Sequence, residues 1–408
     1  MSTVEAITYP LPLTSDGQPD PALRELARTH PVLGVMGPGG PAWLVSGQEA
    51  VREVLADSER FTSVVDPTVT DARARAGVSM VGMDPPEHTR LRRLAAQSFT
   101  ARRIRALLPD IERVADALLD DMARAGPPTD LVTALAVPLP LQVMCQMLRL
   151  PPADQPAFLE WSDVFTGMTA YTAEEIAEAT ARLRSYMSEL AAQRRDKQRR
   201  DKQRRDKQRR DELGEDVLSI LISARDGQDA MTEDELLSTM VLLLVAGHQT
   251  TVRAIARGVL ILLSSGQWGR VVAGEAAMTR VVEEVLRHQT PTDTGLFRRA
   301  KVDTDLAGVR MRAGDQVFLS VQLANLDPDV WTDPQAFDPD RTEQGQHLAF
   351  GHGAHFCLGA PLARAELEIA FTALATRFPG LRLDVDPRDV TWTVKSWLNT
   401  PVSLPVSW

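Results

Sequence analysis

The feature that most limits the fold is a long apolar segment in the middle of the chain. Thr232 and Glu235 form a capping box, in which a threonine and a glutamate three residues later cap the start of a helix. Apolar residues at helical spacing follow as far as Ser264-Ser265-Gly266, where glycine can end the helix. We therefore expect one helix of roughly 32 residues, which must be buried over much of its length.

Helical patterns also dominate the region around this segment, from the end of a long loop at residues 62–86 to about residue 290. Shorter elements lie outside that region. They are a helix from Asp20 to about His30, a hairpin of Val32–Met36 and Ala42–Ser46, a helix over Gln48–Ala56, β-strands near Gly308–Met311 and Gln316–Leu319, a last helix from Pro361 to about Phe378 and a final β-like segment. We therefore expect a mainly α, single-domain fold over residues 1–408, rich in helices and with small peripheral β-sheets.

Composition and charge exclude several classes of protein. The 408 residues are 44% hydrophobic and 25% charged, which is typical of a globular protein with a large core. The apolar runs Met240–Ala246 and Val259–Leu263 are far shorter than a membrane span, and the first residues lack the pattern of a secretory signal. Cys145 and Cys357 offer no disulfide framework. A net charge of −10 argues against nucleic acid as a partner. We expect a cytoplasmic protein that does not associate with a membrane.

A basic repeat stands apart from this acidic chain. Residues 196–210 are three tandem copies of DKQRR, and residues 193–211 contain 11 Lys or Arg and 4 Asp. Each Asp of the repeat lies four residues before an Arg, the order that favours ion pairs along a helix. We interpret the repeat as a solvated helix extension, a surface insert. The alternative is a basic arm that binds nucleic acid or an acidic partner, which the lack of aromatic residues for base stacking disfavours.

A glycine-rich loop around Cys357 carries the strongest sign of chemistry. Residues 350–364 read FGHGAHFCLGAPLAR, and the cysteine lies just before a predicted helix. Because backbone amides at a helix N-terminus favour a thiolate, we expect a lowered thiol pKa and a role as metal ligand or nucleophile. The residues alone leave three alternatives open. They are an inert buried cysteine, a zinc site with His352 and His355 but no obvious fourth ligand, and a nucleophile whose base the fold must supply.

This loop resembles the haem-binding loop of the cytochrome P450 family, in which the cysteine thiolate is the axial ligand of the iron. The residues that stand at the spacing of that family are Phe350, Gly351, Gly353, His355, Cys357 and Gly359. The resemblance implies the cytochrome P450 fold and haem b (iron protoporphyrin IX) as the cofactor. It also implies that Cys357 is the metal ligand and that Phe350 and Gly351 belong to the cofactor-binding loop.

The ExxR motif also fits this resemblance. Glu284 and Arg287 match the ExxR motif of the family, a pattern that by itself predicts only an exposed salt bridge. In the family these side chains, with an arginine that corresponds to Arg341, lock the cysteine loop behind the haem.

The haem propionates would be bound by residues from several segments. His88 and Arg92 are four residues apart and share one face of a predicted helix. The resemblance implies that both bind a propionate, together with Arg298 and His355. Burial of carboxylates requires charge-assisted partners of this kind.

The resemblance also assigns roles in the middle of the long helix. The family usually has a small residue and a glycine followed by an acid and an alcohol, where this chain has AGHQTT at residues 246–251. Gly247 would let the helix distort and leave room for oxygen, and Thr250 matches the catalytic alcohol. Gln249 departs from the pattern because an amide cannot ionise. Either water and Thr250 supply the protons while Gln249 orders water, or the reaction needs fewer protons, as in radical coupling.

Partners and substrate are implied by the family. Its reaction uses dioxygen and electrons from NAD(P)H, and this chain shows no flavin or iron–sulfur motif, so we expect a ferredoxin and a ferredoxin reductase as partners. The basic residues that we expect on the ferredoxin-binding face are Arg93, Arg102, Arg103, Arg105 and Arg364. The expected substrate pocket comprises Val78–Met83, Phe165–Tyr171, Leu243, Ala246, Gly247, Thr294–Phe297 and Leu398–Pro401, which carry no charge.

The sequence therefore predicts a monomeric haem-thiolate monooxygenase of bacterial secondary metabolism that oxidises a mid-sized, mostly apolar natural product. One alternative is oxidative C–C or C–N coupling of aromatic substrates on the same haem. A remote alternative is a non-catalytic haem- or zinc-binding protein.

Overall fold

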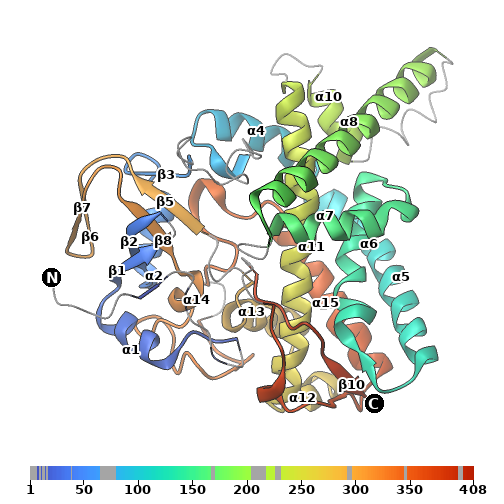
Figure 1. Cartoon of the computed structure of the whole chain (residues 1–408). Helices are drawn as coiled ribbons and strands as arrows, with labels where there is room; N and C mark the ends of the chain where they lie inside the picture. Colours follow the sequence, from blue (N-terminus) through green and yellow to red (C-terminus); the bar gives the residue numbers. More distant parts are fainter. Residues whose placement is uncertain are drawn as a thin grey trace.

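Helices form most of the computed structural model, shown in Figure 1. It describes residues 7–8, 11, 14, 17–37, 39–64, 80–166, 171–203, 217–225, 231–291, 296–343, 347–393 and 398–408. The long apolar segment forms helix α11 (Glu233–Ser264), which runs through the middle of the molecule with other helices beside it.

Helix α11 begins and ends where the sequence predicts. The Glu235 N–H donates to Thr232 Oγ1 at 3.1 Å, and the Thr232 N–H donates to the Glu235 carboxylate at 2.8 Å, which completes the capping box. The predicted length of 32 residues is confirmed. The helix is long and apolar enough to cross a membrane, but 72% of its apolar 18-residue window is buried inside the protein. This burial is what we expect of a core helix.

Helices from both sides of α11 in the chain surround it and share the largest hydrophobic core with it. They are α4 (Glu87–Ala96), α5 (Ala101–Ala125), α6 (Pro138–Leu148), α7 (Gln155–Thr166), α8 (Ala173–Gln203), α10 (Val217–Arg225), α12 (Trp268–Val272), α13 (Met278–His288) and α15 (Ala360–Arg377), with the short turn η2 (Val132–Ala136). The short turn η3 (Pro152–Asp154) precedes α7 and has no buried residue. Among the described residues, the predicted helical region up to residue 290 is confirmed, apart from the short strand β4 (Thr129–Asp130). Residues 167–170, 204–216 and 226–230 of that region lie outside the described part.

A five-stranded sheet lies beside the helices (Figure 1). Its order is β1 (Val32–Gly37), β2 (Gly40–Val45), β8 (Gln316–Leu319), β5 (Leu296–Ala300) and β3 (Phe61–Thr62). β1 and β2 form the predicted antiparallel hairpin, whereas β2 and β8 pair in parallel. The elements that pack on this sheet are α1 (Pro21–Thr29), α2 (Gln48–Ala56) and α14 (Val321–Ala324).

Two small sheets complete the described part of the fold. One joins β4 to β10 (Pro405–Ser407) and β9 (Arg382–Leu383), and the other pairs β6 (Thr304–Leu306) with β7 (Val309–Met311). Short turns of helix are η1 (Met80–Gly82), η4 (Gly353–His355) and η5 (Pro387–Asp389). Of the predicted loop at residues 62–86, residues 65–79 lie outside the described residues.

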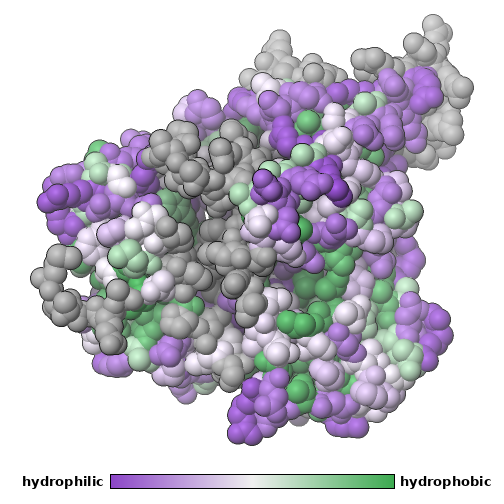
Figure 2. Space-filling model, viewed as in Figure 1, coloured by the Kyte–Doolittle hydropathy of each residue, from purple (hydrophilic) through white to green (hydrophobic). Residues whose placement is uncertain are grey.

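The first half of the basic repeat continues α8, which confirms the predicted helix extension for that half. Residues 196–203 are the last residues of α8, whereas residues 204–210 lie outside the described part of the chain. Arg195 pairs with Glu233 at the start of α11 at 2.8 Å. Beyond this ion pair, α8 extends away from the body of the molecule (Figure 1), and its surface is hydrophilic (Figure 2).

Deletion of the repeat tests its interpretation as a surface insert. Removal of Asp196–Arg210 takes away 15 residues with a formal charge of +6. Because Arg195, which pairs with Glu233 of α11, is retained, we expect haem content and turnover to match those of the wild type. The measurements are the absorption spectrum and NADPH consumption. Intact spectra with slow turnover, recovered by excess ferredoxin, would instead indicate a docking role.

Candidate functional site

The loop that contains Cys357 is closed by a backbone hydrogen bond and contains two positions that require glycine. The Cys357 N–H donates to the Phe350 carbonyl at 2.8 Å. Gly351 and Gly353 have φ angles of +71° and +67°, which other residues rarely adopt. A Cβ atom at Gly353 would also lie 2.5 Å from the Leu55 carbonyl oxygen of α2. Backbone conformation and close packing together explain the glycine-rich sequence.

The thiol of Cys357 lies at the start of α15, as predicted. The amides of Gly359 and Ala360 hydrogen-bond to it, and the guanidinium groups of Arg92 and Arg364 also favour its thiolate. Burial nevertheless raises the pKa of the Cys357 thiol, because desolvation outweighs these four groups. The predicted lowering of the thiol pKa is therefore wrong for the protein alone. A metal cation at the sulfur would reverse this balance, since a coordinating thiol loses its proton.

His352 and His355 do not join Cys357 as zinc ligands. Among the described residues, no group of three His, Cys, Asp or Glu side chains is placed to hold a metal ion. His352 Nδ1 lies 3.4 Å from the Arg52 guanidinium group, and the His355 ring lies 4.0 Å from the ring of His88. The arrangement therefore does not favour the zinc alternative.

Four basic side chains gather beside the cysteine loop, as the resemblance implies. His88 and Arg92 come from α4, Arg298 from β5 and His355 from η4. Arg92 donates to the carbonyl of Phe356. Burial lowers the pKa of Arg298 to about 10 and that of His355 to about 3, and for His355 the neighbouring His88 and Arg298 lower it further.

These buried groups fit a ligand that carries carboxylates. His88 is 1% exposed, and neither of its ring nitrogens has a hydrogen-bond partner among the described residues. Arg298 is 6% exposed and donates to the carbonyl of Phe297 at 2.7 Å. Desolvated donors of this kind are costly unless an anion accepts from them. The donor set therefore fits a haem, whose propionates these bases would bind and whose iron Cys357 would bind.

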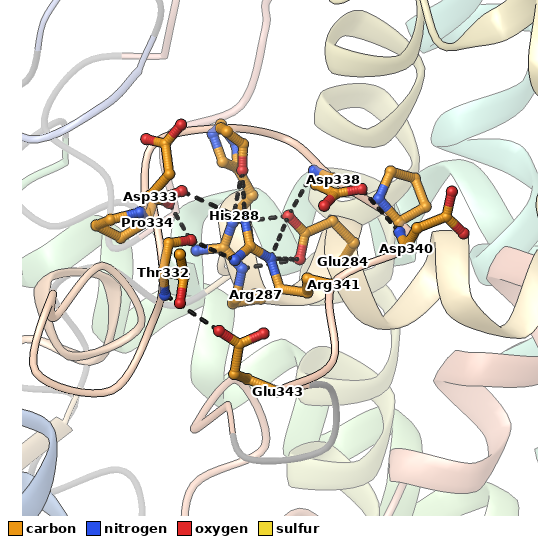
Figure 3. Close-up of polar contacts among 12 residues, drawn as sticks. Glu284, Arg287, His288, Thr332, Asp333, Pro334, Asp338, Asp340, Arg341 and Glu343 are labelled. Atoms are coloured by element: carbon orange, nitrogen blue, oxygen red, sulfur yellow. Dashed lines mark hydrogen bonds and ion pairs between the residues drawn. The ribbon is translucent and has the colours of Figure 1, made fainter.

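A buried polar network ties α13 to the loop at residues 325–341 (Figure 3). Arg287 donates to the Glu284 carboxylate at 2.7 and 2.8 Å, and Arg341 Nε donates to the same carboxylate at 3.1 Å. The three side chains are at most 3% exposed, so the exposed salt bridge that the motif alone predicts is wrong. Arg287 also donates to three carbonyl oxygens of the loop, at 2.7 to 3.0 Å. The implied structural role agrees with this geometry.

Asn325 connects this network to the cysteine loop. Its amide donates to Thr290 Oγ1 at 2.8 Å, just after α13, and its carbonyl oxygen accepts from the Leu348 N–H at 2.7 Å. The Leu348 carbonyl in turn accepts from the Gly351 N–H at 2.8 Å. Sequence reasoning missed Asn325, since an asparagine in a loop gives no signal of its partners.

The middle of α11 is less buried than the rest of the helix. Ala246 is exposed and Thr250 half-buried, although most of α11 is buried. Thr250 Oγ1 donates to the Ala246 carbonyl at 2.7 Å. A Cβ atom at Gly247 would lie 2.7 Å from Met144 Sδ, so this glycine lets α6 approach α11 closely. Its implied role in leaving room for oxygen stays a prediction.

Gln249 turns out to have an acidic partner on another helix. Its Nε2 donates to Asp163 Oδ1 of α7 at 2.7 Å and lies 3.5 Å from Ser162 Oγ. Burial raises the pKa of Asp163, and the bond from Gln249 lowers it by less. Sequence reasoning missed Asp163, because one acid on a helix does not reveal its partner 86 residues away.

The basic face and the substrate pocket are described only in part. Arg364 pairs with Glu283 at 2.6 Å, which offsets its charge. The other predicted arginines, namely Arg93, Arg102, Arg103 and Arg105, are exposed or half-buried. Of the predicted pocket, residues 78–79, 167–170 and 294–295 lie outside the described residues, whereas Leu243 and Pro401 are buried.

Comparison with known proteins identifies the family. The family described as "Cytochrome P450" matches residues 142–267 and 277–402. The chain belongs to the cytochrome P450 family. It is an oxidoreductase of the P450 monooxygenase type, and the predicted mainly α cytochrome P450 fold is confirmed.

Relatives of this P450 act in bacterial natural-product biosynthesis. Nocardicin C N-oxygenase from Nocardia uniformis subsp. tsuyamanensis is 42% identical over the full length of both chains. The LnmA cytochrome P450 hydroxylase from the leinamycin pathway of Streptomyces atroolivaceus has a TM-score of 0.85 and 38% identity, covering 98% of this chain and 100% of that one. Cytochrome P450mel 107F1, with biaryl coupling reactivity, has a TM-score of 0.82 and 38% identity, covering 95% and 96%.

Proposed function

We propose that this P450 inserts an oxygen atom into a mid-sized, mostly apolar natural product. The observation that carries the proposal is the loop around Cys357. Its sulfur accepts from two backbone amides, and the basic groups beside it include His88, which is buried and has no hydrogen-bond partner among the described residues. Relatives named as an N-oxygenase and a hydroxylase support oxygen insertion. When bound, a thiolate-ligated haem supplies the activation of dioxygen.

Different residues of this chain would bind the iron and the propionates of haem b, water and the substrate. Cys357 would bind the iron, in the loop formed by Phe350 and Gly351, and the four bases His88, Arg92, Arg298 and His355 would bind the propionates. Thr250 would bind water and pass protons at its hydroxyl group. Gly247 would leave space beside the haem, and Leu243 and Ala246 would contact substrate from α11.

The partners and setting are part of the same proposal. P450 monooxygenases use substrate, dioxygen and a redox partner, and we propose a ferredoxin with its NAD(P)H-dependent reductase. The exposed arginines Arg93, Arg102 and Arg105 would bind the ferredoxin. We further propose a cytoplasmic monomer in which residues 1–408 form one domain and the basic repeat is a surface insert.

Oxidative coupling of aromatic substrates is a second candidate. Two observations favour it, namely the non-ionisable Gln249 at the position of the family's acid and the likeness to a P450 with biaryl coupling reactivity. Such a reaction joins two substrate carbons or a carbon and a nitrogen without oxygen insertion.

Product analysis with isotope-labelled dioxygen separates the two candidates. The ferrous carbonyl spectrum should first show the red-shifted Soret band of a thiolate-ligated haem. Substrates found by a spin-shift screen are then incubated with the enzyme under labelled dioxygen, and the product masses are measured by mass spectrometry. Oxygen insertion predicts a product with one labelled oxygen atom. An unlabelled product equal to two substrates minus two hydrogen atoms would contradict it and support coupling.

Replacement of Arg298 by alanine tests the proposed propionate site. A charge-assisted hydrogen bond contributes about 1.5–3 kcal/mol, so we expect haem affinity to fall roughly 10- to 100-fold. The measurement is haem transfer to an excess of apomyoglobin. Arg299→Ala is the matched control, because the next side chain along strand β5 points to the opposite face. Equal haem loss in both variants would contradict the assignment of Arg298.

A further inference from the structure

Asp163 touches the position at which α11 departs from the pattern of its family. Gln249 donates to the Asp163 carboxylate at 2.7 Å and approaches Ser162 Oγ at 3.5 Å. Ser162 is 2% exposed, whereas Asp163 keeps an exposed surface. The amide on α11 therefore holds a carboxyl group of α7 that water can reach.

We propose that Asp163 supplies protons to the active site of this P450, in place of the acid that α11 lacks, and that Gln249 is a positioning residue for its carboxyl group. The inference rests on the monooxygenase function proposed above. Insertion of one oxygen atom from dioxygen consumes two electrons and two protons and releases the other oxygen atom as water. Asp163 gives up a proton from its carboxyl oxygen and regains one from solvent, so it is unchanged after each turnover.

The chemistry of the pair matches this division of roles. An amide donates and accepts hydrogen bonds without ionising, whereas a carboxyl group also releases a proton. Burial raises the pKa of Asp163 above its ordinary value. A carboxyl group shifted in this direction is a better proton donor near neutral pH, because more of it is protonated there.

Thr250, the next residue along α11, would continue the proposed route from Asp163. Gln249 and Thr250 are consecutive, so at about 3.6 residues per turn their side chains lie on adjoining faces of the helix. Thr250 Oγ1 donates to the Ala246 carbonyl at 2.7 Å, which leaves its lone pairs to accept from water. Ala246 is exposed, so a water molecule beside it would link Thr250 to the pair of Gln249 and Asp163.

Three titratable side chains on the helices that contact α7 stay uncharged near neutral pH. Burial lowers the pKa of His248 on α11 to about 4 and raises that of Cys145 on α6 to about 12. Burial and Asp154 also raise the pKa of Tyr186 on α8. On α8, Arg184 pairs with Asp234 at 2.7 Å. A pH effect that disappears when Asp163 is changed therefore reports on its carboxyl group.

The test moves the acid from α7 to α11. Asp163→Asn keeps an oxygen that accepts from Gln249 but removes the titrating proton, and Gln249→Glu places a carboxyl group on α11. The double variant carries its acid on α11 alone. Glu160→Gln, an exposed change on α7, is the matched control. A plant-type ferredoxin and its reductase supply electrons, and NADPH consumption with dioxygen alone is measured over about pH 5–9 in light and heavy water.

We expect Asp163→Asn to lower the rate of NADPH consumption and the double variant to restore it. Asp163→Asn should slow NADPH consumption roughly tenfold, less than the typical 10²–10⁴-fold for general acid–base catalysis, because water also reaches the site. Its pH dependence should flatten and its solvent isotope effect should rise. The double variant should recover most of the rate, and Glu160→Gln should match the wild type. A double variant as slow as Asp163→Asn would show that Asp163 is only a structural tie. A rate unchanged in Asp163→Asn would also overturn the proposal.

A second measurement needs no turnover. Because folding raises the pKa of Asp163, its contribution to stability is lost as pH rises from its unfolded pKa through its folded pKa. Asp163→Asn should therefore gain stability relative to the wild type across that window, as measured by urea unfolding. A stability difference that does not change with pH would contradict the assigned environment of Asp163.

The outcomes also separate this inference from the proposed function. An absent thiolate–haem spectrum in the wild type would overturn both. A normal spectrum, with NADPH consumption in Asp163→Asn equal to that of the wild type, would overturn this inference alone.

Discussion

Replacement of Cys357 by serine should abolish oxidation while leaving the chain folded. A serine hydroxyl group stays protonated at neutral pH and cannot act as a thiolate donor to iron. The loop should persist, because its closing bond runs from the backbone N–H of residue 357 to the Phe350 carbonyl at 2.8 Å. The amides of Gly359 and Ala360 can donate to the serine oxygen as they do to the sulfur.

The ferrous carbonyl spectrum and NADPH-dependent product formation measure this change. The serine variant should lose the red-shifted Soret band, and its product formation should fall to the level of the haem-free protein. Cys145→Ala is the control, because Cys145 is 2% exposed and burial raises the pKa of its thiol to about 12. That variant should keep the wild-type spectrum. Full activity and an unchanged spectrum in Cys357→Ser would contradict the axial ligand assignment.

Local signals explain what the sequence could predict. The start and end of α11 depend on contacts within a few residues, such as the capping box at Thr232 and Glu235, so the pattern alone placed them. The hairpin of β1 and β2 follows from a short turn for the same reason. The site loop was predictable from its resemblance to the haem-binding loop of the family, and the glycines that carry part of that resemblance, Gly351 and Gly353, have a backbone conformation that favours glycine.

Contacts between distant segments explain what the sequence could not predict. Asp163 meets Gln249 across 86 residues, and Asn325 joins Thr290 to Leu348 only in the folded chain. The prediction of a lowered thiol pKa for Cys357 failed for a related reason. The helix N-terminus was visible in the sequence, but the burial that outweighs it is a property of the assembled fold.

Removal of the Arg287 guanidinium group should cause the largest loss of stability among these variants. Arg287→Met leaves the Glu284 carboxylate, 0% exposed, without the partner that donates to it at 2.7 and 2.8 Å. It also leaves three loop carbonyls without their donor. Breaking a buried ion pair of this kind costs about 3–5 kcal/mol. Arg341 still donates to Glu284 at 3.1 Å, so we expect a loss near the lower end of that range.

Urea unfolding and haem content together test this prediction. Arg287 donates to the backbone carbonyl of Asn325, and the side chain of Asn325 accepts from the Leu348 N–H beside the cysteine loop. Loss of Arg287 should therefore loosen this loop, and haem should be lost at urea concentrations where the helices remain folded. Arg287→Lys keeps the charge but has fewer donors, and should fall between the wild type and Arg287→Met. The matched control is Arg182→Met, which breaks an exposed helical pair with Glu178 at 2.6 Å and should cost about 0–1 kcal/mol. Equal losses in Arg287→Met and Arg182→Met would mean that the buried network does not hold the cysteine loop.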